Sequence, residues 1–351
     1  MVGSVPLEEV ETAIVERLEE LGYSVDTQSF TTSTRSMVAV AVTGAACGWM
    51  ALILAPFLVV GFSGWPVTVT GFAAFSLVVL LAVGVNGGMI PVPAWETTAT
   101  NIVAQRGEPP AFWLVAHSDS KAQRLSLAGR VLAVGALAAG LSVLAVGLVA
   151  RLFVPLPWWV AAPAVVLTAV GGAALSRGTV SDDSPGAVDN ATGVIAALVA
   201  AERLRSRANV GVLVTGAEEL AMAGARAWLE SGAPGGQFVN FDGIDSCGRY
   251  RLMTHGRRRT ALGERSAEIA RVLVEKLAES GAVVGRLGLP LGVLVDGVIL
   301  QRGGMPGVTV SRGAWRTLRV VHTDADLPER VDIAAAVCAG EAAARAIEAL
   351  C

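Results

Sequence analysis

Seven acidic or histidine side chains in this chain stand where apolar segments end or helices begin, and all are of types that bind metal ions. The chain has only 3 histidines, and two of them belong to this set. The set comprises His117 and Asp119 in "AHSD", Asp189 in "AVDNATG", Glu218 and Glu219 in "GAEEL", Asp242 in "NFDGID" and His322 in "VHTDAD". Neutral imidazoles and carboxylates are ligands that zinc takes in proteins. The sequence therefore predicts a zinc site assembled from separate segments.

Each of these motifs alone also has a purely structural explanation. Asp189 is of a residue type that often caps a following helix. The two adjacent glutamates suit the first turn of a helix, where acidic side chains complement the helix dipole. His322 is compatible with a turn before the last helix, with Asp326 as the cap of that helix. Taken jointly, the repeated placement of metal-binding residue types after apolar segments favours a site.

Strand-like and helical segments alternate along the charged parts of the chain, and they are the elements that must position these side chains. The expected elements are a helix at 5–21, an extended segment at 23–32, strands at 100–107 and 111–119, a helix at 191–206, a strand at 209–216, a helix at 221–231, a strand at 237–244, a helix at 265–280, strands near 291–298 and 307–312, and a closing helix after Pro328. This alternation predicts an α/β fold with a mixed, mostly parallel sheet and helices on both faces. Sites in such folds form at the ends of the strands.

Two long uncharged stretches interrupt this pattern. Residues 36–95 contain no charged side chain, and "FSGWPV" at 62–67 divides them into two halves. A second pair of apolar runs, 131–150 and 152–176, is separated and flanked by single arginines. A membrane-spanning helix needs about 20 apolar residues, so each stretch predicts a transmembrane hairpin. Buried core helices are the alternative, but they are seldom free of charge over such a length twice in one chain.

The two hairpins divide the chain into a discontinuous globular domain and two insertions. We expect the globular domain at 1–35, 90–125 and 177–351, the first hairpin at 36–89 and the second at 126–176. Four spans return the chain to the side it left, so the globular segments can fold together. Basic residues are more frequent at the globular end of the hairpins than at the opposite turns, which predicts a cytoplasmic domain. The acidic, amphipathic amino terminus does not resemble a secretory signal, in agreement with this orientation.

Composition excludes several classes of protein. With 53% hydrophobic and 16% charged residues, the chain is too apolar for an ordinary soluble enzyme. Its net charge of −3 and its lack of a long basic block argue against nucleic acid as a partner. The 4 cysteines show no paired spacing that would predict a disulfide framework. The expected spans carry no ionisable side chain other than flanking arginines, so no ion path of a transporter is visible.

The order of the motifs resembles that of metallopeptidase family 28, the co-catalytic di-zinc aminopeptidases and their relatives. The shared order is His-x-Asp, Asp-Asn-x-x-Gly, Glu-Glu, Asp and a final His-Thr, and it covers essentially the whole non-membrane part of the chain. Any one motif is weak, but all of them in this order are a specific signal. The resemblance implies an aminopeptidase-like α/β fold, two zinc ions and a peptide substrate.

The resemblance also implies a role for each motif residue. His117 and Asp242 would bind one zinc ion, Glu219 and His322 the other, and Asp189 would bridge the two ions. Asp119 would orient the ring of His117 from behind. Glu218 would act as the general base that takes a proton from the attacking water and returns it to the leaving amine.

Two departures from the family pattern bear on these expectations. The second hairpin separates His117 and Asp119 from Asp189, where many relatives have a short loop. Relatives often carry an "SDH"-like element before the last strand, and this chain has "LVDGV" at 294–298. No residue is therefore assigned to oxyanion stabilisation or to recognition of the substrate amine. His255 and the run Arg257–Arg259 lie outside the pattern and are expected at the surface.

The function expected from the sequence is that of a membrane-anchored di-zinc aminopeptidase, with a peptide substrate and the lipid bilayer as partners. Two alternatives remain open. One is a single-zinc cyclase or amidohydrolase of the same family, and the other is an inactive, peptidase-like membrane scaffold. The oligomeric state is left open by the sequence.

Overall fold

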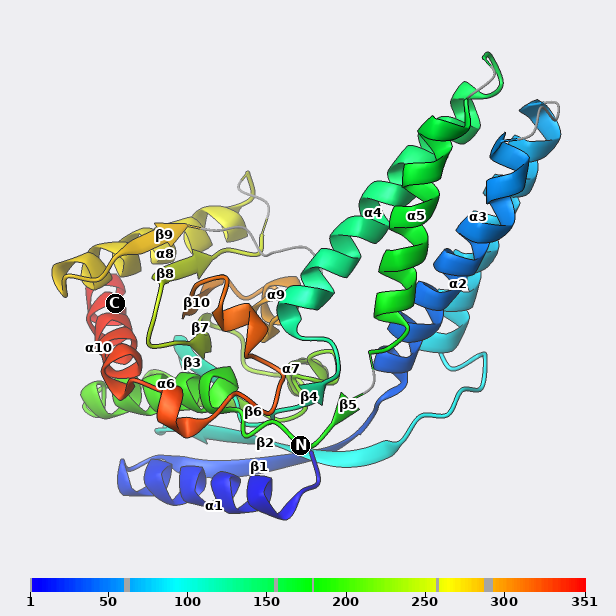
Figure 1. Ribbon diagram of the computed structural model, residues 1–351. Helices are drawn as coiled ribbons and strands as arrows, with labels where there is room; N and C mark the ends of the chain where they lie inside the picture. Colours follow the sequence, from blue (N-terminus) through cyan, green and yellow to red (C-terminus); the bar gives the residue numbers. More distant parts are fainter. Residues whose placement is uncertain (1, 60–63, 155–156, 179, 257–258, 287–292) are drawn as a thin grey trace.

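The structure is a computed structural model that describes residues 2–59, 64–154, 157–178, 180–256, 259–286 and 293–351. Figure 1 shows a layered α/β region and a group of long helices that extends away from it. The four helices are inserted as two pairs at widely separated points of the sequence of the α/β region.

An eight-stranded sheet organises the α/β region within the described residues. Its strands, in spatial order, are β1 (Ser24–Ser33), β2 (Glu96–Gln105), β6 (Val210–Thr215), β3 (Phe112–His117), β7 (Gln237–Ile244), β10 (Gly307–Gly313), β8 (Arg249–Met253) and β9 (Val284–Arg286). The four central strands β6, β3, β7 and β10 run parallel, whereas β1, β2 and β8 introduce antiparallel pairs. The predicted mixed, mostly parallel sheet is confirmed.

Helices cover both faces of this sheet, as predicted. On one face lie α1 (Val5–Glu20), α6 (Thr192–Arg203), α8 (Ala261–Glu279) and α10 (Ile333–Leu350), and on the other α7 (Ala223–Glu230) and α9 (Asp296–Arg302). Successive side chains of β3 point to alternate faces, so Leu114 packs among residues of the first face and Trp113 among those of the second. All six residues of β3 are buried, as expected for a strand covered on both sides.

Local sequence explains where several of these helices begin. The hydroxyl of Thr260 accepts a hydrogen bond from the backbone N–H of Gly263 and caps α8. The carboxylate of Asp332 does the same for α10 by accepting from Ala334. Each cap satisfies a backbone donor that the first turn of a helix leaves without a partner.

One predicted element is wrong, and four of the described strands, β8, β9 and the two short strands β4 (Ala122–Gln123) and β5 (Val180–Ser181), are additional to the prediction. The expected strand near 291–298 is not found: residues 293–295 belong to no strand, helix α9 starts at Asp296, and residues 291–292 lie outside the described residues. A short apolar run such as "VLVDGV" does not distinguish strand from helix by periodicity. Strands β8 and β9, at one end of the sheet, were not predicted.

The ends of the second inserted pair of helices meet in a small two-stranded sheet. Strands β4 (Ala122–Gln123) and β5 (Val180–Ser181) pair antiparallel, with Ala122 opposite Ser181 and Gln123 opposite Val180. The pairing brings the segment after His117 next to the segment before Asp189. The insertion therefore leaves these two motifs close together, as they would be if a short loop joined them.

The four long helices are α2 (Arg35–Val59), α3 (Gly64–Asn86), α4 (Leu127–Ala150) and α5 (Trp158–Leu175). All four are long and apolar enough to cross a membrane. Helix α5 begins at Trp158, so the second half of this pair is shorter than the expected 152–176. The division of the chain into one globular domain and two hairpins stays a prediction.

Glycines allow these helices to pack closely. A Cβ atom at Gly171 of α5 would lie 2.7 Å from the carbonyl oxygen of Ala133 of α4, so only glycine fits there. Gly44 and Gly48 of α2 form a small-xxx-small pattern and pack against Gly172 of α5. Such patterns let helix backbones approach closely in membrane proteins. The hydroxyl of Thr68 in α3 donates to the carbonyl of Leu148 in α4 at 2.7 Å and links the two pairs.

Large apolar side chains project outward from these helices. Trp49, Leu80, Val146 and Val170, one from each helix, are each more than 60% exposed. Apolar surface of this extent is costly in water and is typical of a surface that contacts lipid or another protein.

Candidate metal centre

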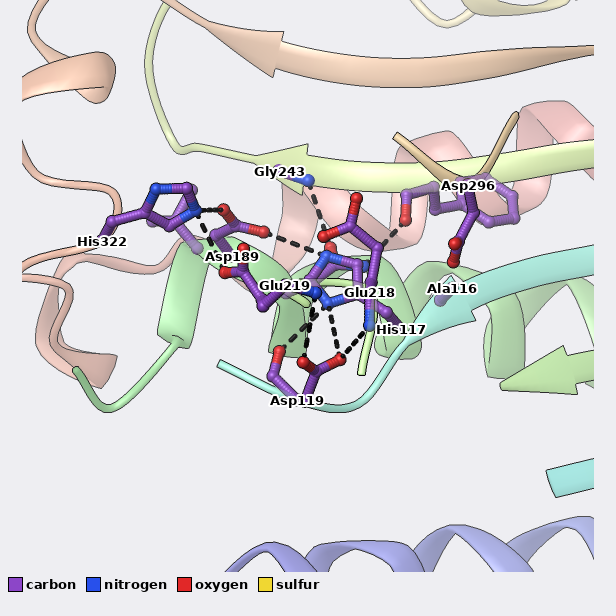
Figure 2. A network of polar contacts seen from close by, with 12 residues as sticks. Ala116, His117, Asp119, Asp189, Glu218, Glu219, Gly243, Asp296 and His322 are labelled. Atoms are coloured by element: carbon purple, nitrogen blue, oxygen red, sulfur yellow. Dashed lines mark hydrogen bonds and ion pairs between the residues drawn. The ribbon is translucent and has the colours of Figure 1, made fainter. Parts of the chain in front are cut away.

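The predicted metal-binding residues lie together at one edge of the sheet, where the parallel strands end. His117 is the last residue of β3, Asp242 lies in β7, and the glutamate pair follows β6. Asp189 lies in a single irregular turn, Ala187–Ala191, that leads into α6. His322 lies in the loop after β10. Figure 2 shows Asp189 and Glu219 between His322 on one side and His117 on the other.

These side chains form two groups that share one residue. His117, Asp189 and Asp242 offer ligand atoms that all lie within 4.8 Å of one another, and so do Asp189, Glu219 and His322. Asp189 belongs to both groups. All five expected ligands are thus brought together.

The two oxygens of Asp189 face different histidines. Its Oδ1 lies 3.1 Å from Nε2 of His117, and its Oδ2 lies 3.2 Å from Nε2 of His322. The same His322 nitrogen is 3.0 Å from Oε1 of Glu219. A carboxylate with one oxygen directed to each group has the arrangement that a residue bridging two cations requires.

Buried acceptors without hydrogen bonds support a fit to metal ions. Oδ1 of Asp189 and Oε1 of Glu219 are buried and accept no hydrogen bond from any described residue, although histidine nitrogens are close. A buried acceptor without a partner is costly, and a bound cation removes that cost. The carboxylate and imidazole donor set matches zinc. The residues present therefore fit the metal that the sequence implies.

Electrostatics lead to the same conclusion. Burial, together with the charge of Asp189, raises the pKa of Asp242 to about 7. Burial also raises the pKa of Glu218 well above its usual range, and the neighbouring carboxylates of Glu219 and Asp242 add to the increase. Several carboxyl groups confined in a buried space resist full ionisation without a compensating positive charge. A divalent cation would supply that charge.

Asp119 contacts His117 through its backbone carbonyl rather than through its carboxylate. The ring Nδ1 of His117 lies 3.0 Å from the backbone carbonyl oxygen of Asp119 and 3.7 Å from its carboxylate. The carboxylate instead accepts hydrogen bonds from the backbone N–H groups of Glu218 at 2.9 Å and Glu219 at 3.2 Å. Asp119 therefore positions both the histidine and the glutamate pair (Figure 2).

Lys121 is a site residue that sequence reasoning missed. Its side chain is only 4% exposed, and its Nζ lies 2.6 Å from Oε2 of Glu219 and donates to the carbonyl of Glu219 at 3.0 Å. Burial opposes ionisation of Glu219, but His322 and Lys121 outweigh it and hold the pKa of Glu219 at about 2. The only sequence signal was its position two residues after Asp119.

Two further residues hold the turn that carries Asp189. The carboxylate of Asp326 accepts from the backbone N–H groups of Val188 at 2.8 Å and Asp189 at 3.2 Å, so it does not cap the last helix. The side chain of Asn190 donates to the carbonyl of Phe241 at 2.9 Å and accepts from Gly243 at 3.1 Å. These bonds fix Asp189 relative to β7, the strand that contains Asp242.

Backbone conformation also contributes to the placement of the site residues. His322 has φ +65°, and Ala217, just before the glutamate pair, has φ +55°. Residues other than glycine adopt this left-handed region at a cost of roughly 1–3 kcal/mol, and such positions cluster at functional sites. Both residues lie in loops. The conformation of each loop directs a proposed ligand, His322 in one and Glu219 in the other, toward the other proposed ligands.

The "LVDGV" segment places a buried acid behind the site. Asp296 is 1% exposed, accepts a hydrogen bond from the hydroxyl of Thr215, and has its pKa raised to about 6 by burial.

The expectation that His255 lies at the surface is wrong. Its ring is partly buried, and Nε2 lies 2.8 Å from the hydroxyl of Thr309. Of the basic run, Arg259 is exposed, while residues 257–258 lie outside the described residues.

A cavity of about 570 Å³ opens at this edge of the sheet. Its polar end is lined by Asp189, Glu218, Glu219, Asp242 and His322, among others. Its volume is within the range of small-molecule sites, about 300–1,000 Å³. A substrate bound there would lie against the proposed base and most of the proposed ligands.

Comparison with known proteins agrees with this fold. The model of peptidase family M28 matches residues 101–347. No curated protein has a sequence that matches the chain.

Solved structures of low sequence identity share the fold. An aminopeptidase from an Aneurinibacillus species is 12% identical with a TM-score of 0.53, over 99% of this chain and 89% of its own. A zinc aminopeptidase from Bacillus subtilis is 12% identical with a TM-score of 0.54, over 100% and 90%. A glutaminyl cyclase from Porphyromonas gingivalis is 13% identical with a TM-score of 0.56, over 100% and 92%.

Proposed function

Because this chain belongs to peptidase family M28, we propose that it is a membrane-anchored di-zinc aminopeptidase that removes amino-terminal residues from peptides. The observation that carries the proposal is the pair of ligand groups joined by Asp189. A zinc-dependent enzyme of hydrolytic or related type is supported by the family itself; the number of ions, the aminopeptidase specificity and the membrane anchor are our proposals.

In this proposal, His117 and Asp242 hold one zinc ion, Glu219 and His322 hold the second, and Asp189 is shared between them. When bound, zinc supplies Lewis-acid chemistry that polarises a carbonyl group and makes a water molecule more acidic. Lys121 pairs with Oε2 of Glu219, whereas Oε1 of Glu219 lies beside His322. Oε1 therefore remains available to bind the second zinc ion.

Glu218 is the proposed general base. It is buried, it lines the cavity, and it follows the β6 strand end directly beside a proposed ligand. Burial raises its pKa, so its carboxylate holds a proton more strongly than an exposed glutamate does. Glu218 would take a proton from the attacking water and deliver it to the amine that leaves.

We also propose that helices α2 to α5 anchor the protein in a bilayer, with the α/β region on the cytoplasmic side. The four apolar helices support the anchor. Among the basic residues near the globular ends of the hairpins, Lys121 is buried in an ion pair with Glu219, so we leave it out of the count that sets orientation. Arg35, Arg124, Arg130 and Arg177 still outnumber Arg151 at the opposite turn, which favours this orientation by the positive-inside rule.

The alternatives differ in metal content and reaction. A single-zinc cyclase, suggested by the fold likeness to glutaminyl cyclases, would need only one ligand group, whereas two are assembled in this chain. An inactive scaffold would be expected to lack a ligand or the base, whereas five candidate ligands and the proposed base Glu218 lie close together in this chain, which supports an active enzyme.

The experiment is a paired assay on the full chain purified in detergent. Zinc per chain and amino-acid release from a panel of peptides are measured for the parent, for Glu218→Gln, and for Glu230→Gln as an exposed control. We expect two zinc ions in all three proteins and a loss of roughly 10²–10⁴-fold in kcat for Glu218→Gln alone. Absence of both zinc and turnover in the parent would overturn the proposal.

A further inference from the structure

The cavity at the metal centre extends beyond the polar side chains and continues between the long helices. Its walls include Met37 and Val40 from α2, Val83 from the end of α3, and Leu137 from α4. Leu127 and Leu137 lie ten residues apart on α4, so the apolar wall runs for about 15 Å along that helix. The cavity thus has a polar end at the proposed metal ligands and an apolar end in the proposed membrane anchor.

This apolar end is accessible from outside the protein. Val40 is 38% exposed and Val83 is 55% exposed, and both lie on helices whose outward surface is apolar. An apolar chain that moved from the bilayer into the cavity would therefore remain in contact with apolar side chains.

The cavity also contains a cation that is free to pair with a ligand. Arg130, in the first turn of α4, lines the cavity, and the charges of Glu218 and Glu219 act on it. Within the described part of the chain, no ion pair or side-chain hydrogen bond joins its guanidinium group to another residue. Lys121, by contrast, is already paired with Glu219. Arg226 also lines the cavity but is exposed.

From these observations we propose that the natural substrate is an amphipathic amide. Its apolar chain would lie between α2, α3 and α4, and an anionic group on it, a carboxylate or a phosphate, would pair with Arg130. A planar guanidinium group binds either anion through paired hydrogen bonds. This inference rests on the proposed amide-hydrolysing function and specifies its substrate class.

The test uses the zinc-loaded full chain in lipid nanodiscs and three families of leucyl amides with alkyl chains of increasing length. One family is neutral (leucyl alkylamides), one carries a carboxylate (leucyl 2-amino fatty acids), and one carries a phosphate (leucyl phosphatidylethanolamines). Leucine release gives KM and kcat. The last two families distinguish a carboxylate substrate from a phospholipid substrate.

Four variants show whether the effects of chain length and of the anionic group on KM arise in the cavity. Val40→Trp fills the apolar end, and Leu52→Trp adds the same side chain at an exposed position of α2 outside the cavity. Arg130→Gln removes the cation, and Arg124→Gln removes an exposed arginine that does not line the cavity. Partition of long chains into the bilayer affects all variants equally, so differences among them report the cavity.

We expect KM to fall with chain length in the parent and in Leu52→Trp, and to be nearly independent of length in Val40→Trp. Arg130→Gln should raise KM for one anionic family by about 10–100-fold, the loss expected for a charged hydrogen bond, and leave the neutral family within about two-fold. Arg124→Gln should behave as the parent. Equal chain-length dependence in Val40→Trp, or an equal effect of Arg130→Gln on neutral and anionic substrates, overturns the inference while leaving the proposed function intact.

A binding measurement distinguishes failure of the proposed aminopeptidase function from failure of the inference about the substrate. If no leucine is released from any substrate, the proposed aminopeptidase function fails, and binding of a dansyl-labelled fatty acid and of its methyl ester then decides the inference. Tighter binding of the acid that is weakened by both Val40→Trp and Arg130→Gln supports the cavity site. Equal binding by parent and variants overturns it.

Discussion

The carboxylate of Asp119 accepts a hydrogen bond from the backbone N–H of Glu218 at 2.9 Å. The residue expected to orient a histidine ligand therefore also fixes the segment that carries the proposed base. The backbone carbonyl of the same Asp119 lies 3.0 Å from Nδ1 of His117. One residue thus couples the geometry of a proposed ligand to that of the proposed base.

Asp119→Asn should lower activity without unfolding the protein. An amide retains one acceptor oxygen but presents N–H donors to the second backbone N–H, so the glutamate pair loses part of its support. Changes behind metal ligands typically cost about 10–100-fold in metal affinity or activity, and we expect kcat/KM to fall by that amount. Asp26→Asn, at an exposed position of β1, is the control. Kinetics and zinc affinity equal to those of the parent would contradict the coupling.

Lys121→Met should destabilise the metal-free protein strongly. Removing one partner of a buried ion pair leaves a buried charge without compensation, which costs about 3–5 kcal/mol in the free energy of unfolding. Zinc binding should recover part of that loss because it supplies positive charge next to Glu219. Lys276→Met breaks a surface pair with Glu279 and should cost about 1 kcal/mol or less. Thermal unfolding with and without zinc measures both, and equal losses for the two variants would refute the buried role of Lys121.

Zinc affinity should depend on pH more strongly in one ligand group than in the other. The pKa of Asp242 is raised to about 7, so below that pH its carboxyl group is protonated and must release a proton before it binds metal. Glu219, with a pKa of about 2, stays ionised throughout this range. Affinity at the Asp242 group should therefore fall as pH decreases from 7.5 to about 5.5, beyond the loss that histidine protonation causes at both groups. Calorimetric titrations that show the same pH dependence for both ions would contradict this assignment.

The second pair of inserted helices should be removable without loss of the metal centre. Strands β4 and β5 already place Gln123 opposite Val180, so a short turn can replace residues 126–176. We expect the shortened protein to bind zinc and to cleave short soluble peptides within a few-fold of the parent. Activity on membrane-embedded peptides should fall, because α4 supplies part of the apolar cavity wall. Full activity on those peptides would show that these helices only anchor the protein.

The site could largely be predicted from the sequence because its ligands lie at strand ends. His117 and the glutamate pair each follow a continuous apolar strand, and parallel strands bring such positions to one edge of a sheet. Lys121 could not be predicted in this way, since its partner Glu219 is 98 residues away and a lone lysine gives no pattern. The same holds for Asp326, whose hydrogen bonds to the Asp189 turn span 137 and 138 residues.

The fold was predictable where segments were long and periodic. The helices found at 5–20 and 261–279 were expected at 5–21 and 265–280, and the apolar hairpins were expected from their length. Helix α9 was mistaken for a strand because seven residues are too few to reveal a helical period. The two-residue strands β4 and β5 are set by tertiary pairing rather than by local preference, yet they bring the two halves of the site together.

The zinc content of four single variants tests whether Asp189 joins two metal sites. If Asp189 joins two metal sites, the parent should bind two zinc ions, His117→Ala and His322→Ala should each retain one, and Asp189→Ala should lose both or bind them far more weakly. His255→Ala, at a histidine outside both ligand groups, should keep two. A parent with one zinc ion, or an Asp189→Ala variant that retains two, would contradict the shared site on which the proposed function rests.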